Sequence, residues 1–128
     1  MRVKTLICNC KGQSDSFRNL DMNTLPFEIE SELDVDYALV HPELCGQGGN
    51  EALEDTLRAA AEEPDTFIVL AGCAPETQLK LFKKIMSRTG FDPARFVPVD
   101  IQGTNNDGAV KHLREKLEAL LHPEKKPH

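Results

Sequence analysis

Thr66-Phe67-Ile68-Val69-Leu70-Ala71, followed at once by Gly72-Cys73-Ala74-Pro75, is the stretch that decides the fold. Its first part is apolar or β-branched throughout, which is typical of a strand covered on both faces in a parallel sheet. Pro75 suits the first position of a helix. We therefore expect a buried strand that runs directly into a helix, with Cys73 at the junction.

Strand and helix patterns alternate around this stretch. Further strands are predicted at Val3–Cys8, Tyr37–Val40 and Arg95–Ile101, and a short helix at Pro26–Leu33. Three longer helices are predicted from apolar stripes, which are Leu53, Leu57 and Ala60; Leu79, Phe82 and Met86 with Ile85; and Val110, Leu113, Leu117 and Leu121. Asn50 is expected to cap the first of the three, after a glycine-containing loop, and Gly90 to end the second.

This alternation predicts an α/β fold built from βαβ units. We expect a small open parallel sheet of about four strands in the order 2-1-3-4, with helices on both faces as in flavodoxin-like folds. Residues 1–122 are expected to form one domain, and residues 123–128 a flexible tail.

Composition excludes several function classes. The chain has 128 residues, a net charge of −6, no Trp and one Tyr, so it lacks the basic face and stacking platform of nucleic-acid-binding proteins. No stretch approaches the roughly 20 apolar residues of a membrane span. Residues 1–7 lack the apolar region of a signal peptide. We therefore expect a cytoplasmic protein without membrane insertion.

Four cysteines are the candidate site residues, because disulfides are rare in a reducing compartment. Cys8 and Cys10 lie at the carboxyl end of the first strand, Cys45 lies just past the second, and Cys73 lies just past the third. Open parallel sheets bind ligands at this edge, so we expect the four thiols to converge.

Four thiolates suit either zinc or an iron–sulfur cluster. Structural zinc sites favour cysteine pairs with about two to four residues between them, and this chain has none, because only Asn9 separates Cys8 from Cys10. A cluster is wider than one ion and accepts ligands from separate loops. The pattern favours iron–sulfur, and a zinc- or persulfide-binding thiol protein without an electron-transfer role is the alternative.

Three motifs in chain order resemble the N-terminal domain of the large, flavin-carrying subunit of heterodisulfide reductases. They are Leu6-Ile7-Cys8-Asn9-Cys10, then Glu43-Leu44-Cys45-Gly46-Gln47-Gly48, then Val69-Leu70-Ala71-Gly72-Cys73-Ala74-Pro75-Glu76-Thr77. The likeness continues through Gly90-Phe91-Asp92-Pro93 and Val99-Asp100-Ile101, and it covers about Val3 to Gln102.

The resemblance implies a [4Fe–4S] cluster on Cys8, Cys10, Cys45 and Cys73. It also implies an electron-transfer role, and its protein redox partner would be a flavoprotein or an iron–sulfur subunit. The sequence shows no base, nucleophile pair or substrate pocket, so we expect no catalytic activity in the chain alone. Proteins of the family continue into a flavin domain, which this sequence lacks. They also tend to carry a further cysteine soon after the position of Ile101, where this chain has Gln102-Gly103-Thr104-Asn105.

Other interpretations of single features stay open at this point. His41 could replace one thiolate as ligand, and Cys8 and Cys10 could act as a redox dithiol, although they lack the Cys-x-x-Cys spacing. The glycines at 46, 48 and 49 precede a helix as in phosphate loops, but the Lys-Ser/Thr ending is absent. The acidic residues between Glu28 and Asp36 form a solvated face or a dock for a basic partner.

Overall fold

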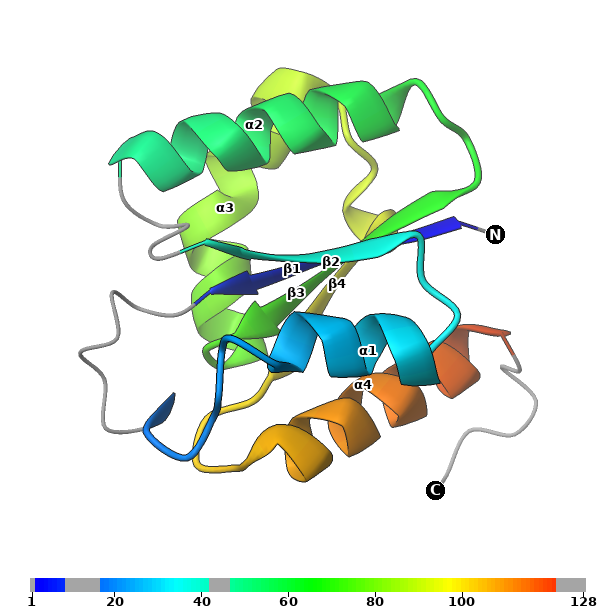
Figure 1. Ribbon diagram of the computed structural model, residues 1–128. Coiled ribbons are helices and arrows are strands. Elements are labelled where there is room, and N and C mark those ends of the chain that lie inside the picture. The colour runs from blue at the N-terminus through cyan, green and yellow to red at the C-terminus, as the bar shows by residue number, and fades with distance from the viewer. Residues whose placement is uncertain (1, 9–16, 42–46, 122–128) are drawn as a thin grey trace.

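The computed structural model describes residues 2–8, 17–41 and 47–121, in which strands and helices alternate (Figure 1). The strands are β1 (Arg2–Cys8), β2 (Tyr37–His41), β3 (Thr66–Gly72) and β4 (Phe96–Asp100). The α-helices are α1 (Leu25–Glu32), α2 (Gln47–Ala61), α3 (Pro75–Thr89) and α4 (Asn106–Leu121). A 3-10 turn at Pro93–Arg95 leads into β4.

The four strands form one parallel sheet in the order β2-β1-β3-β4. This confirms the predicted α/β class, the parallel pairing and the 2-1-3-4 order. Helices α2 and α3 cover one face of the sheet, and α1 and α4 cover the other (Figure 1). The chain therefore changes direction between β1 and β3, which is the switch point at which such sheets bind ligands.

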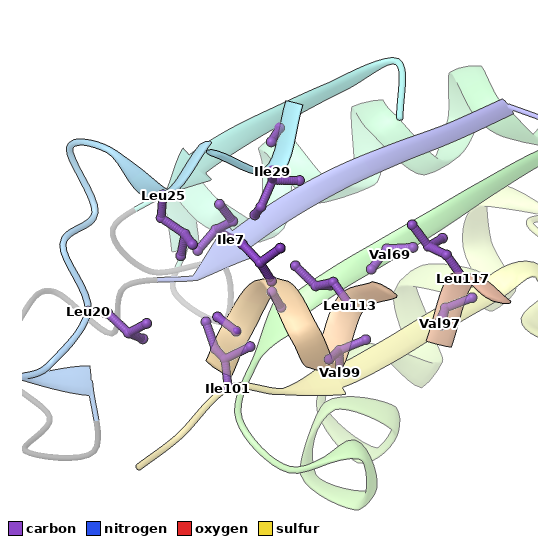
Figure 2. Packing of buried hydrophobic residues seen from close by; sticks show 14 of the residues in the cluster. Ile7, Leu20, Leu25, Ile29, Val69, Val97, Val99, Ile101, Leu113 and Leu117 are labelled. Atoms are coloured by element: carbon purple, nitrogen blue, oxygen red, sulfur yellow. The ribbon is translucent and has the colours of Figure 1, made fainter. Parts of the chain in front are cut away.

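Each face of the sheet has its own apolar core. On the α1/α4 side, Ile7, Val69 and Val99 pack with Ile29 and Leu113 (Figure 2). On the α2/α3 side, the buried residues are Leu6, Cys8, Leu53, Leu57, Ala60, Ile68, Leu70, Phe82, Ile85, Met86, Phe91 and Phe96. The central strands β1 and β3 contribute to both cores, which explains their nearly continuous apolar sequence.

The predicted phase of α3 is wrong at one position. The apolar spacing predicts Leu79 on the buried stripe, but its side chain is 43% exposed. Gln78 is buried instead, together with Phe82, Ile85 and Met86. Gly90 ends the helix in the left-handed conformation, as predicted.

The start of α2 also differs from the prediction. The helix begins at Gln47 and includes Gly48 and Gly49, so Asn50 lies inside it and is not its cap. Helix α1 likewise begins at Leu25, with Thr24 as the N-cap residue and the proline in its first turn. Within the described ranges, no helix is both long and apolar enough to cross a membrane.

Candidate functional site

The carboxyl ends of all four strands lie along one edge of the sheet (Figure 1). The last residues of the strands are Cys8, His41, Gly72 and Asp100. Cys8 is in register with His41 on one side, and Gly72 is in register with Asp100. Because Ile7 pairs with Ala71, the next residues, Cys8 and Gly72, adjoin across the central strand pair. We call this line of strand ends the carboxyl edge.

Cys8 ends β1 and Cys73 directly follows β3, so both lie at the middle of the carboxyl edge. Cys8 is buried and belongs to the core beneath α2 and α3, whereas Cys73 is half-buried directly after β3. A Cβ atom at Gly72 would lie 3.4 Å from the Cβ of Cys8, so position 72 is in van der Waals contact with Cys8. Two of the four predicted ligands therefore come from neighbouring strand ends at the switch point.

The other two candidate cysteines, Cys10 and Cys45, lie outside the described residues. Among the residues that are described, no group of three or more His, Cys, Asp or Glu side chains is arranged to hold a metal ion. His41, the alternative ligand, ends β2 opposite Cys8 and is half-buried. The described part of the site thus consists of Cys8 and Cys73, with His41 one strand away.

Gln78 is a buried polar side chain that the sequence patterns missed. Its Nε2 atom donates to the carbonyl oxygen of Cys73 at 2.7 Å and lies 3.4 Å from the carbonyl oxygen of Val99. Its Oε1 atom is buried and has no hydrogen-bond partner in the described structure. A buried acceptor left unpaired costs about 1–3 kcal/mol, and such exceptions in native proteins call for an explanation.

The N-terminus of α3 lies two residues after Cys73, the residue that follows β3. Ala74 occupies the N-cap position and makes no side-chain cap hydrogen bond. Helix N-termini carry partial positive charge and favour anions such as thiolates nearby. Cys73 directly precedes Ala74. This position favours a thiolate over a neutral apolar side chain.

The segment after β4 also reaches the carboxyl edge. A polar hollow of about 430 Å³ is lined by Asn19, Gly103, Thr104 and Asn105. Gly103 adopts a φ of 69°, which only glycine takes up readily. The described part of this lining offers amide and hydroxyl groups, which are not soft metal ligands.

A group of ion pairs lies at the opposite end of the sheet. Glu63 pairs with Lys4 at 3.0 Å and with Arg2 at 3.1 Å, beside the start of β1. The hydrogen bond from Lys4 is the main reason why the pKa of Glu63 is lowered. On the α2/α3 face, Arg88 and Arg58 lower the pKa of Glu54 in the same way. These pairs stabilise the scaffold and lie away from the cysteines.

Comparison of the sequence with protein-family models gives no match, and comparison with curated proteins gives no significant match.

Proposed function

We propose that this chain is an iron–sulfur protein that carries single electrons, or serves as an electron-transfer component of a larger heterodisulfide-reductase-like redox complex. The cluster would be a [4Fe–4S] centre held by Cys8, Cys10, Cys45 and Cys73. The observation that carries the proposal is the position of Cys8 and Cys73 at the ends of two adjacent strands.

Covalent geometry supports the remaining two ligands. Cys10 follows Cys8 by two residues, and Cys45 follows His41 by four. An extended chain advances at most about 3.6 Å per residue, so both thiols are tethered within reach of the carboxyl edge. Four ligands from three separate strand ends suit a cluster better than a single small ion.

The surroundings of the two cysteines also fit a cluster. Cys8 lies in an apolar core, which limits the access of water, and Cys73 lies beside the uncapped start of α3. Burial, charge and hydrogen bonds around sulfur are the protein's means of setting a cluster's potential. When bound, the cluster would supply reversible one-electron chemistry. The chain's own residues would hold it and shield it.

A protein redox partner and a reducing compartment complete the proposal. A one-electron carrier needs a donor and an acceptor, and a flavoprotein or an iron–sulfur subunit can be either. Four thiol ligands remain available in the cytoplasm, where disulfides are rare. We therefore place the working protein in the cytoplasm.

Anaerobic expression followed by metal and sulfide analysis tests the proposal. We expect iron and acid-labile sulfide in equal amounts, near one four-iron cluster per chain, together with broad visible absorption. Serine at position 8, 10, 45 or 73 should remove most of the iron, because oxygen is a harder ligand than thiolate.

A His41→Ala variant is the matched comparison, since His41 is the alternative ligand at the same edge. It should keep the cluster if all four cysteines are ligands. Zinc without iron after anaerobic expression would overturn the proposal in favour of a zinc- or persulfide-binding thiol protein. A cysteine whose serine variant keeps an unaltered spectrum is not a ligand.

A further inference from the structure

We infer that Gln78 is a positioning residue for Cys73: its buried side-chain amide holds the Cys73 peptide and thereby orients the thiol at the carboxyl edge. The inference rests on the proposed function in treating Cys73 as a cluster ligand. The positioning itself is a property of the chain and is measurable without a cluster.

Gln78 makes two hydrogen bonds to the residues at the start of α3. Its backbone N–H donates to the carbonyl oxygen of Ala74 at 3.0 Å, as in a regular helix. Its side-chain Nε2 donates to the carbonyl oxygen of Cys73 at 2.7 Å. The carbonyl of Cys73 precedes the N-cap residue, so the regular helical hydrogen bonds do not use it. Gln78 therefore fixes two consecutive peptide units, including the one that follows the Cα atom of Cys73.

Gln78 and Gly72 also contact the end of β4 and the residue that follows it. The same Nε2 atom lies 3.4 Å from the carbonyl oxygen of Val99, and the N–H of Ile101 donates to the carbonyl oxygen of Gly72 at 3.0 Å. Through these contacts Gly72, which precedes Cys73, and Gln78, which follows it, are both bonded to the end of β4 or to the residue after it. The thiol thus projects from a segment that is held by two elements.

Gln78 also lies near Cys8. A Cβ atom built at Gly72 would lie 3.4 Å from the Cβ of Cys8 and 4.0 Å from Nε2 of Gln78. Cys8 and Gln78 thus lie on the same side of Gly72, the residue that precedes Cys73. A change at Gln78 therefore alters the surroundings of Gly72, next to both described cysteines.

An apolar residue would pack better than glutamine at position 78. Gln78 has no exposed surface, and its Oε1 atom lacks a partner among the described residues. A methionine side chain has similar length and flexibility, fills irregular space well, and carries no unpaired amide oxygen. An amide is needed at this position for its donor, and that donor serves Cys73.

The test compares Gln78→Met, which removes the donor but keeps the volume, with Gln78→Asn, which keeps the amide but shortens its reach. Thr89→Val is the matched control, because Thr89 is a buried polar residue at the far end of the same helix. Its hydroxyl donates to carbonyl oxygens of its own helix, those of Ile85 and Met86.

The first readout is the alkylation rate of Cys73 in the metal-free, full-length protein. Trypsin places Cys73 on a peptide of its own, Ala59–Lys80, so mass spectrometry follows it separately. Alkylation of a half-buried thiol requires local opening. We expect both Gln78 variants to raise this rate by at least about threefold, because the segment opens more often, and Thr89→Val to leave it unchanged.

The second readout is the spectrum and midpoint potential of the anaerobically prepared protein. We expect the Gln78 variants to shift both, and the Thr89→Val variant to match the wild type at equal metal content. Unchanged Cys73 alkylation in both Gln78 variants, with a loss of thermal stability like that of Thr89→Val, would overturn the inference.

The two readouts separate this inference from the proposed function. If the wild-type protein holds no iron, the proposed function fails and the alkylation rate alone decides the role of Gln78. If Gln78→Met does not fold, the Asn variant is measured in the same way and its alkylation rate decides.

Discussion

Gly72 faces Cys8 across the central strand pair, and a Cβ atom at position 72 would lie 3.4 Å from the Cys8 Cβ and 3.3 Å from Cδ2 of Leu70. The contact to Cys8 is ordinary van der Waals distance, whereas the contact to Leu70 is tight. One methyl group therefore requires a small shift of a flexible leucine. A larger side chain would press directly on Cys8 and on the amide of Gln78.

This geometry predicts a graded response at position 72. Gly72→Ala should keep most of the iron, whereas Gly72→Val should lose most of it and destabilise the fold by about 1–3 kcal/mol through overpacking. Metal content and thermal denaturation of the two variants check this. Gly48→Ala is the control, because nothing lies within 4 Å of a Cβ atom there. Equal iron in the Ala and Val variants would show that the Cys8 position does not matter for binding.

Removal of the metal should leave the fold intact. The two apolar cores on either face of the sheet depend on packed side chains such as Leu57, Leu70 and Leu113, none of which is a candidate ligand. Binding of the proposed cluster would then order mainly the cysteine-bearing segments. We expect segments Cys8–Gly12 and Leu44–Gly49 to lose amide-exchange protection in the metal-free protein.

The control for that experiment is the protection of the central strands. Amides in the middle of β1 and β3 should exchange within about tenfold of their rates in the loaded protein, since their opening requires global unfolding. Loss of protection throughout the sheet would instead show that folding itself depends on the metal. Equal protection of the cysteine-bearing segments in both forms would show that the metal orders neither.

Stability should depend on pH through Glu63 at the other end of the sheet. Its pKa lies below the ordinary 4.5, first because of the hydrogen bond from Lys4. A lowered folded-state pKa stabilises the protein above the ordinary value, and this contribution is lost as the pH falls through the lowered pKa. Urea denaturation should therefore show Glu63→Gln to be less stable than the wild type at pH 7, with the difference shrinking below pH 4.5.

Glu118→Gln is the control for that measurement, because Glu118 is an exposed carboxylate on α4. It should change stability little at either pH. Iron content should be unaffected in both variants, since the ion pairs of Glu63 lie beside the start of β1 and not at the carboxyl edge. A stability difference for Glu63→Gln that grows on acidification would contradict the assigned role.

The sheet was predictable from sequence because its signals are strong and independent of context. Six consecutive residues from Thr66 to Ala71 favour a buried strand. The alternation with helices then leaves few parallel topologies open. That Cys8 and Cys73 end up on one edge follows from the parallel order alone. The order was therefore enough to bring these two cysteines to the same edge.

The errors arose where tertiary contacts override local patterns. In α3, the apolar spacing of Leu79, Phe82 and Met86 fits a helical stripe as well as the true one does, and a glutamine gives no apolar signal. Gln78 is buried, and its side chain donates to the carbonyl of Cys73, a contact that depends on the fold. In α2, Gly48 and Gly49 indicated a loop on propensity, but both lie in the first turn of the helix.

The proposed cluster also predicts how charge near α3 controls electron exchange. Glu76 is exposed in the first turn of α3, three residues after Cys73, so its charge lies near the proposed cluster. The reduced protein should donate electrons to the anion ferricyanide and to the cation hexaammineruthenium(III) at rates that the local charge biases in opposite directions. Stopped-flow oxidation of the loaded protein at low ionic strength measures both rates.

Glu76→Lys should raise the rate with ferricyanide and lower the rate with the ruthenium complex, each by about two- to fivefold at low ionic strength. Glu76→Gln should change each rate about half as much. The changes in both variants should become smaller at high salt, because salt screens the interaction between the side-chain charge and the oxidant. Glu118→Lys makes the same charge change on α4, away from the carboxyl edge, so it should alter neither rate appreciably. If Glu118→Lys acts as strongly as Glu76→Lys, net charge rather than local charge governs the exchange. In that case the electron leaves from somewhere other than the start of α3.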